Sequence, residues 1–358
     1  MALMLRSLEP RHAEAWDAFV ASHPSGTFFH RAAWAEVITT AFGHTSLYTL
    51  AERDGVIVGV LPLAQMKTRL FGNILVSTPF CVYGGPLASD AETAAALATH
   101  AEALRARSGA TAVELRQRDP ADNYLQTGDF PAGAGSAGNW VTRADLYVTF
   151  RKPIVANDDA NLKAIPRKQR AMVRKGIQHG LASRVDQDAD TLHRIYAESV
   201  RNLGTPVFAR RYFRILLAVF RDCADVVTVL DNGTPVAAVL NFYFRDEVLP
   251  YYGGGTQAAR RVAGNDFMYW EVLRRAAARG ARLFDFGRSK VGTGAFAFKH
   301  NWGFTPAPLP YRYSLAPGAA IPDHNPLNPK YRLFIAAWKR LPLPIANLIG
   351  PPIVRGLG

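Results

Sequence analysis

Two stretches of the chain alternate apolar and polar residues on both sides of a short turn. The first, LYTLAERDGVIVGVLPL, begins at Leu47, and the second, VVTVLDNGTPVAAVLNF, begins at Val226. Such alternation is typical of strands that bury one face, and Asp-Gly or Asn-Gly between two such runs is a strong hairpin signal. The pattern therefore predicts two β-hairpins, with turns at residues 54–55 and 232–233.

The elements around the two predicted hairpins recur in the same order. Each half has helices before its hairpin and, after it, a glycine-marked strand, an alanine-rich helix, a strand and a last strand. The paired segments are residues 83–85 and 251–255, 91–108 and 267–279, 109–116 and 280–288, and 145–150 and 311–315. An internal repeat of this length predicts two copies of one structural unit.

The length of the chain, 358 residues, also favours two domains, because a single hydrophobic core stops growing below this size. We place the N-terminal domain at residues 1–155 and the C-terminal domain at residues 156–320, with a basic lead-in at residues 161–185. Residues 321–358 then form a basic and apolar tail.

The repeated order of elements is similar to that of the GNAT fold, in which the central strands of a mixed sheet splay beside a glycine-containing strand. A splayed strand leaves backbone N–H groups that can hold an acyl carbonyl and its developing oxyanion. Glycines at the strand end permit the close approach of a ligand. The predicted fold class is α/β with mixed sheets, built from tandem GNAT-like domains that form one two-lobed molecule.

The chain carries a formal net charge of +13, which favours polyanionic partners such as tRNA, coenzyme A, linked sugars or a membrane face. The densest basic segment, residues 163–175, contains no acid. Its candidate phosphate-binding residues are Arg167, Lys168, Arg170 and Arg174. Three of these arginines recur at helical spacing, so we expect a cationic stripe that binds phosphates; a merely solvated helix face is the alternative.

Other chemistries lack their motifs. The nine histidines occur without HExxH spacing, and no G-x-S-x-G or GxxxxGK[ST] segment is present. Cys81 and Cys223 lie far apart in the sequence, so we predict reduced core cysteines and no metal site. No apolar run reaches the roughly eighteen residues that a spanning helix needs, which predicts a cytoplasmic protein.

A possible donor loop lies in the second half, where Arg261-Val-Ala-Gly264 matches the start of the Gln/Arg-x-x-Gly-x-Gly/Ala turn that binds a pyrophosphate in coenzyme A-dependent GNAT enzymes. The candidate cofactor-binding residues are Arg261, Gly264 and Asn265. Asp266 departs from the pattern, and a carboxylate facing a diphosphate would oppose binding. A simple loop and helix cap is the alternative interpretation.

Three further segments carry a resemblance to a known family. They are FFHRAAWAEVITTAFG near the start, PRKQRAMVRKGIQHGL between the halves and FAFKHNWGF near the end. Together with the tandem halves, over residues 16–315, they resemble the FemAB family, and most of all its branch associated with exosortase, PEP-CTERM and exopolysaccharide loci. The resemblance implies transfer of an aminoacyl group, typically from aminoacyl-tRNA, to an amine of a small-molecule or lipid-linked envelope precursor. It implies no tightly bound cofactor.

The resemblance also implies roles for particular residues. It places Lys299, in FAFKHNWGF, near the donor ester, where an ammonium could stabilise the oxyanion; a surface lysine over Trp302 is the alternative. Asp285 ends a buried strand and could accept a proton from the attacking amine, with Arg288 beside it as a substrate ligand. An internal Asp/Arg pair that closes the sheet fits the pattern equally well.

Three more residues are candidate acceptor ligands. Tyr251 and Tyr252 are adjacent in a strand, so one faces the predicted cleft and the other the core. Arg31, in FFHRAAW, is a candidate for an acceptor phosphate.

The tail leaves two interpretations open. Residues 330–355 are basic, aromatic and apolar, and Trp338 between cations suits a peripheral contact with the inner membrane. The same segment could instead pack over the second half as a C-terminal arm.

Two other functions compete with aminoacyl transfer. One is a coenzyme A-dependent N-acetyltransferase, which differs in its donor. The other is a non-catalytic assembly factor that binds nucleic acid or an anionic membrane.

Overall fold

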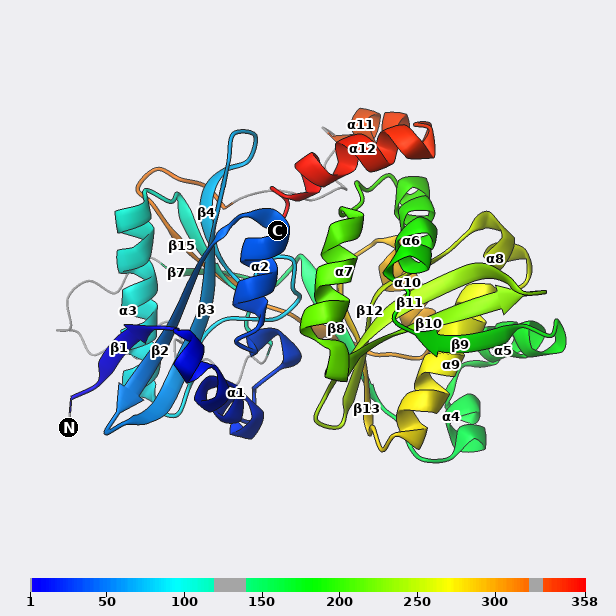
Figure 1. Ribbon diagram of the computed structural model, residues 1–358, viewed down its shortest axis with the longest axis horizontal. Coiled ribbons are helices and arrows are strands. Elements are labelled where there is room, and N and C mark those ends of the chain that lie inside the picture. Colours follow the sequence, from blue (N-terminus) through cyan, green and yellow to red (C-terminus); the bar gives the residue numbers. More distant parts are fainter. Residues whose placement is uncertain (1, 119–139, 322–330) are drawn as a thin grey trace. The chain divides into compact units, whose positions relative to one another are not determined.

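The computed structural model describes residues 2–118, 140–321 and 331–358, and it divides into two compact units (Figure 1). Unit 1 comprises Met1–Tyr147, Pro308–His324 and Gly356–Gly358. Unit 2 comprises Val148–Ala307 and Asn325–Arg355.

Unit 1 contains a mixed sheet with helices. Its elements are β1 (Met4–Ser7), η1 (Pro10–His12), α1 (Ala13–Ser22), η2 (Phe28–His30), α2 (Trp34–Phe42), β2 (Thr45–Arg53), β3 (Val56–Thr68), β4 (Gly72–Ser77), β5 (Leu87–Ala88), α3 (Ala91–Ser108), β6 (Ala112–Leu115), β7 (Trp140–Arg143) and β15 (Tyr311–Leu315).

Unit 2 contains the second mixed sheet. Its elements are β8 (Tyr147–Pro153), α4 (Asp158–Ala164), α5 (Arg167–Gln178), β9 (Ala182–Asp186), α6 (Ala189–Leu203), α7 (Arg210–Val219), η4 (Arg221–Cys223), β10 (Ala224–Asp231), β11 (Thr234–Phe244), β12 (Glu247–Gly255), α8 (Gln257–Arg261), α9 (Gly264–Ala278), β13 (Leu283–Lys290), α10 (Gly294–Asn301), β14 (Pro306–Pro308), α11 (Arg332–Trp338) and α12 (Leu343–Val354).

Both predicted hairpins are confirmed. β2 pairs with β3, and β10 pairs with β11, each in antiparallel register. The turn residues Asp54 and Gly55 have φ values of 55° and 79°, and Asn232 and Gly233 have 47° and 80°. Positive φ at both central residues is the type I′ geometry that matches the twist of the flanking strands. The local turn chemistry therefore set both hairpins.

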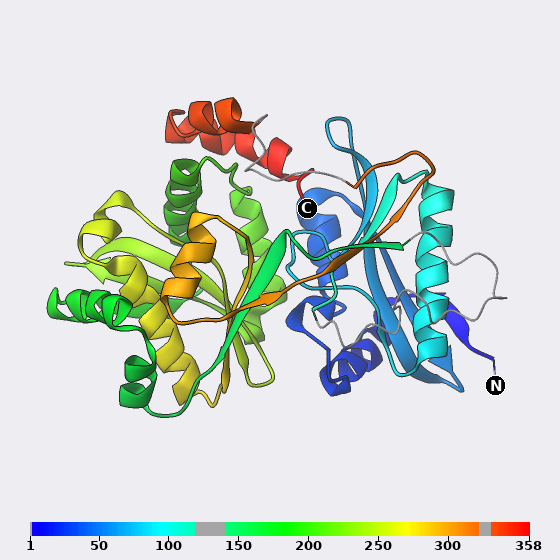
Figure 2. The ribbon, with the colours of Figure 1, turned by 180° about the vertical axis from the view of Figure 1, so that it is seen from behind.

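The last strands of the two halves are exchanged, which corrects the predicted domain boundaries. Along the first sheet the strand order is β1-β2-β3-β4-β6-β15-β7, with β5 on β3, and along the second it is β14-β8-β13-β12-β11-β10-β9. β8, which the repeat places at the end of the first half, lies beside β13; β15, at the end of the second half, lies beside β6 (Figure 2). A boundary after residue 155 therefore divides both sheets, because it assigns β8 to the first half and β15 to the second.

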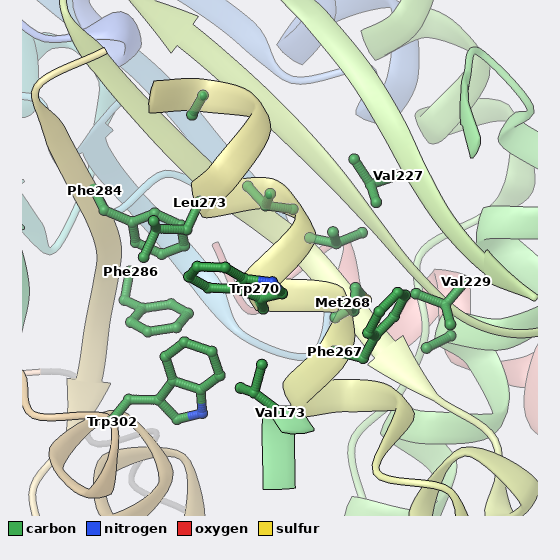
Figure 3. Packing of buried hydrophobic residues seen from close by; sticks show 14 of the residues in the cluster. Val173, Val227, Val229, Phe267, Met268, Trp270, Leu273, Phe284, Phe286 and Trp302 are labelled. Carbon is green, nitrogen blue, oxygen red and sulfur yellow. The ribbon is translucent and has the colours of Figure 1, made fainter. Parts of the chain in front are cut away.

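The core of unit 2 lies between α9 and the sheet (Figure 3). Figure 3 shows Phe267, Met268 and Trp270 of α9 directed at side chains from β10, β13 and the segment after α10. α5 covers α9 on the outside, where Val173 is fully buried. Gly176 allows this approach, because a Cβ there would lie 2.8 Å from the Cβ of Phe267. Unit 1 has an equivalent core of strand leucines against α3.

Candidate functional site

The central strands of unit 2 separate soon after they begin. β12 and β13 run parallel and pair at Glu247 with Leu283 and at Val248 with Phe284. Both strands lie wholly within the described residues, and they form no further register pair, although β12 continues to Gly255. The predicted splay is therefore confirmed.

A bulge lies on the other side of β12. The register with β11 shifts between Leu240 and Asn241, which leaves Tyr251 as the extra residue. Tyr251 is half-buried, with its ring 5.6 Å from that of Phe242. Tyr252 is buried, and its hydroxyl lies 2.9 Å from the hydroxyl of Tyr212. The expectation that one of the two tyrosines is a core aromatic is confirmed for Tyr252.

Protein side chains occupy the space beside the glycines that end β12. A Cβ on Gly254 would lie 2.5 Å from the Cβ of Ser199 in α6, and one on Gly253 would lie 2.8 Å from Val239. A Cβ on Gly255 would collide with Asn265 at the start of α9. Because neighbouring strand residues face opposite sides, α6 and α9 cover opposite faces of the sheet. These glycines therefore serve helix packing, where the sequence predicts ligand approach.

The segment between α8 and α9 forms a tight turn. Ala263 has φ 58°, in the left-handed region, and Gly264 is the first residue of α9. A Cβ on Gly264 would lie 3.0 Å from the Cβ of Ala259, so glycine is needed for this close turn. The first N–H groups of a helix lack intrahelical partners and attract anions. Arg261, three residues before Gly264, is exposed.

Asp266 faces the interior of unit 2, which overturns the objection that its carboxylate opposes a diphosphate. Its Oδ1 accepts hydrogen bonds from Gln169 Nε2 at 2.6 Å and from Trp302 Nε1 at 3.0 Å. Burial raises the pKa of Asp266 above its usual value, while these two hydrogen bonds act in the opposite direction. The carboxylate is thus a core acceptor that links α9 to α5 and α10.

Asp285 is a buried anchor at the open side of β13. Its side chain is 0% exposed and lies 3.3 Å from the Nε of Arg151, which also pairs with Glu247. Its Oδ1 accepts the backbone N–H of Gly287 at 2.6 Å, and Gly287 has φ 63°. An internal Asp/Arg pair is therefore present, and its arginine is Arg151 of β8.

Lys299 holds the backbone at the end of β13. Its Nζ donates to the carbonyls of Phe286 at 2.6 Å, Gly287 at 3.2 Å and Arg288 at 2.8 Å. Burial lowers the pKa of Lys299 to about 7; the nearby carboxylate of Asp285 raises it, and the charge of Arg288 lowers it. An ammonium has three donors, and these three carbonyls match them in number. Lys299 therefore shapes this strand end, and it is not a surface lysine.

The short helix α10 and the residue after it contact both β13 and α9. From α10, Lys299 reaches β13, and Trp302, just after the helix, reaches Asp266 in the first turn of α9. Trp302 is 1% exposed. The geometry of the β13 end and of the α9 start is thus coupled through α10. The start of α9 and the end of β13 are thus held by contacts from one short segment.

The comparisons with known proteins identify a domain family in this region and a shared fold. Residues 161–300 match the family model of the acetyltransferase (GNAT) domain. The GNAT match begins within α4 and ends in α10, so it includes both strands of the splay, β12 and β13. No curated protein sequence matches the chain.

Several solved structures share the tandem GNAT fold. The crystal structure of FemX matches with a TM-score of 0.66 and 17% identity, covering 94% of this chain and 100% of that chain. L-PGS from Bacillus licheniformis matches with a TM-score of 0.54 and 12% identity, covering 93% and 97%. A tandem GNAT protein from the clavulanic acid biosynthesis pathway matches at 0.53 and 14%, covering 89% and 100%. At these identities the likeness shows the fold, two mixed α/β sheets, as predicted.

The predicted cationic stripe lies on α5, mostly on its solvent-exposed side. Arg167, Lys168 and Arg174 of α5 are exposed and Arg170 is half-buried, while Gln169, on the inward side, contacts Asp266. Among the described residues, no carboxylate lies within ion-pair distance of these four cations. α5 therefore presents a cationic face that its own unit does not neutralise.

The first-half motif FFHRAAW is a packing centre of unit 1. Arg31 Nε lies 3.2 Å from Asp17 Oδ2, so this predicted phosphate ligand is in an ion pair. His30 is buried, which lowers its pKa to about 3, and its Nδ1 accepts the backbone N–H of Thr27 at 3.2 Å. Trp16 donates to the carbonyl of His30 at 2.7 Å.

Sequence reasoning missed Arg151, Glu247 and Gln169, which complete the walls of the splay. Arg151 lies in the exchanged strand β8, so its contact with Asp285 spans a long stretch of chain. Its signal was weak, because a lone arginine in an alternating strand predicts a solvent-facing residue. Lys299, Asp285, Gly264 and Asn265 all lie in unit 2.

Proposed function

We propose that the chain is an acyltransferase that moves an acyl or aminoacyl group onto an amine of a cell-envelope precursor. The observation that carries the proposal is the splay of β12 and β13, with the α9 N-terminus on one side and the Asp285–Lys299 network on the other. The GNAT match over this region supports acyl transfer, and the likeness to FemX and L-PGS supports an envelope acceptor. The exopolysaccharide branch stays a prediction.

The proposed reaction needs little from the side chains beyond positioning. The amine attacks the ester or thioester carbonyl, the C–N bond forms, and the tetrahedral oxyanion collapses with loss of the donor oxygen or sulfur. The amine proton ends on that leaving atom, so no dedicated protein base is required. Backbone N–H groups near the Tyr251 bulge are our candidates for holding the oxyanion.

The buried network changes the proposed roles of two residues. A general base must reach the proton that it removes, and the Asp285 carboxylate is enclosed and ion-paired. We therefore propose Asp285 and Lys299 as positioning residues that hold the end of β13, in place of a base and an oxyanion ligand. Arg288 and Tyr251 stay candidate substrate ligands.

Two acyl donors, aminoacyl-tRNA and acyl-CoA, are each favoured by one feature of the structure. The cationic face of α5 favours aminoacyl-tRNA, because a row of arginines with no carboxylate partner in the described part of the chain suits a nucleic-acid backbone. The inward turn of Asp266 favours an acyl-CoA, because it frees the α9 N-terminus for a diphosphate beside Arg261.

Donor binding tests the proposal and separates these alternatives. Affinity is measured for an aminoacyl-tRNA, the same tRNA deacylated, and acetyl-CoA, each at two salt concentrations. Deacylated tRNA controls for the attraction of any polyanion to a chain of net charge +13, which falls steeply with salt.

The variants assign the donor. Tighter binding of charged than of deacylated tRNA, lost in Arg167→Gln/Arg170→Gln/Arg174→Gln but kept in Arg261→Gln, supports the tRNA donor. Saturable binding of acetyl-CoA alone, lost in Arg261→Gln, supports the acyl-CoA donor. If neither activated donor binds more tightly than deacylated tRNA, the chain is a binding protein and the proposal fails.

A further inference from the structure

The two helices of the tail expose large apolar side chains. These side chains, which we call the tail face, are Leu333 and Phe334 of α11 and Ile345, Leu348 and Ile349 of α12. Leu333 is 84% exposed and Leu348 is 76% exposed. α12, LPIANLIGPPIV, contains no charged residue. An outward helix face without any polar side chain is unusual for a helix whose other side already packs against its own unit.

The opposite side of the tail is firmly docked on unit 2. Ala346, Gly350 and Val354 are buried, and a Cβ on Gly350 would lie 3.0 Å from the backbone N of Val207. In α11, Ile335 packs on Gly204 at the end of α6. The tail thus behaves as the predicted C-terminal arm, and its folding on unit 2 leaves the tail face outward.

Trp338 is not part of this outward surface. It is 3% exposed and its ring lies 5.3 Å from that of Phe334. The sequence therefore assigned interfacial character to the wrong residue. The exposed aromatic of this region is Phe334, at 42%.

The charged residues of the tail segment itself have one sign. Arg332, Lys339, Arg340 and Arg355 are exposed, and the sequence contains no acidic residue after Asp323. A segment that combines exposed apolar side chains with cations and contains no carboxylate matches the interface of a bilayer that contains anionic lipids. A second copy of the chain would instead bring the same cations together in a symmetric contact, which is unfavourable.

We propose that the tail face docks unit 2 on the surface of an anionic lipid bilayer, with α11 and α12 in the plane of the interface. No helix among the described residues is both long and apolar enough to cross a bilayer, so the docking is peripheral. The apolar side chains insert among the acyl chains, and the four cations contact headgroup phosphates. This docking stands independently of which donor unit 2 uses.

Vesicle flotation of the full chain tests the proposal, with phosphatidylcholine vesicles compared with vesicles that also contain phosphatidylglycerol. We expect binding to the anionic vesicles. Leu333→Ser/Leu348→Ser should weaken vesicle binding by at least about tenfold, because binding of this variant no longer removes two leucine side chains from water. Lys339→Gln/Arg340→Gln should weaken it about fivefold per charge, with a smaller effect at high salt.

Two matched controls distinguish binding through the tail face from non-specific hydrophobic or electrostatic binding to vesicles. Leu70→Ser removes a leucine that is 73% exposed in unit 1, and Arg167→Gln/Arg174→Gln removes the same charge from α5. Both should bind anionic vesicles like the unaltered chain, and all the substituted side chains are exposed, so each variant should keep its thermal midpoint.

Equal binding by the unaltered chain and Leu333→Ser/Leu348→Ser overturns the proposal. So does an equal loss in the α5 control, which would show attraction to charge alone. Sedimentation that reveals a dimer lost in Leu333→Ser/Leu348→Ser, together with no vesicle binding, would assign the face to a second copy instead.

Discussion

The two units share a strand order but treat their central splay differently. In unit 1, β4 and β6 pair at Leu75 with Val113 and at Val76 with Glu114. Beyond this point Ser77 Oγ accepts from the N–H of Arg116 at 2.8 Å, so a side chain continues the contact between the strand ends. In unit 2 the end of β13 is held instead by a lysine from a separate helix.

A buried arginine stabilises the splay of unit 1. Arg116 is 2% exposed, and its guanidinium donates to the carbonyls of Cys81 at 2.6 Å and Gly358 at 2.8 Å and pairs with Glu114 at 2.6 Å. Its own carbonyl accepts the N–H of Gly84 at 2.8 Å. The comparison teaches that one topology supports a scaffold in unit 1 and, as we propose, a transfer site in unit 2.

Replacing the buried arginine gives the largest expected effect. Arg116→Met should lower the free energy of unfolding by about 3–5 kcal/mol, because it removes the guanidinium from the Glu114 carboxylate, the buried carbonyl of Cys81 and the half-buried carbonyl of Gly358. Urea denaturation measures the loss. Donor binding, measured where the variant is still folded, should be unchanged; a parallel loss of binding would show that the unit 1 splay belongs to the site.

Asp285→Asn should weaken unit 2 by about 1–3 kcal/mol, because Arg151 keeps its second partner, Glu247. Acyl transfer should nevertheless fall by more than about tenfold, since the end of β13 shifts. The matched control is Asp225→Asn, another buried aspartate, which bonds Asn241 and Arg279. If both variants lose transfer equally, Asp285 is a general stability residue.

Two substitutions of Asp266 disturb the start of α9 to different extents. Asp266→Ala leaves the donors of Gln169 and Trp302 unsatisfied and should cost about 1–3 kcal/mol at neutral pH. Asp266→Asn keeps the acceptor oxygen and should match or exceed the stability of the unaltered chain at neutral pH.

The raised pKa of Asp266 determines whether its contribution to stability grows or shrinks as the pH rises. Its folded pKa is raised, so its contribution to stability is full below the unfolded pKa and is lost as the pH rises through the folded pKa. Thermal midpoints across this range should fall for the unaltered chain relative to Asp266→Asn. Parallel profiles would contradict the assignment of a desolvated carboxylate.

The smallest effect at neutral pH is expected from His30 in unit 1. Burial lowers its pKa to about 3, so between about 6.5 and 3 the unfolded chain binds the additional proton, and stability falls as the pH falls. His30→Gln should show a shallower loss of thermal midpoint on acidification. An unchanged slope would remove His30 from the pH-sensitive part of unit 1.

Local chemistry explains what could be predicted from the sequence. Asp54-Gly55 and Asn232-Gly233 favour one turn type, and Asp90 followed by an alanine-rich run and Gly109 defines a capped helix, found at Ala91–Ser108. The repeat of these signals was enough for the tandem fold and for the position of the splay. Each signal acts within a few residues, so no distant contact was needed to recognise it.

Only the tertiary structure decided the exchange of β8 and β15, because either strand alternates in a way that fits either sheet. It also decided that Asp266 faces inward, that Trp338 is buried and that Arg151 is the partner of Asp285. These outcomes depend on which segments, far apart in the chain, pack against one another and become buried. A sequence read residue by residue specifies helices and hairpins, whereas burial and ion pairing belong to the packed whole.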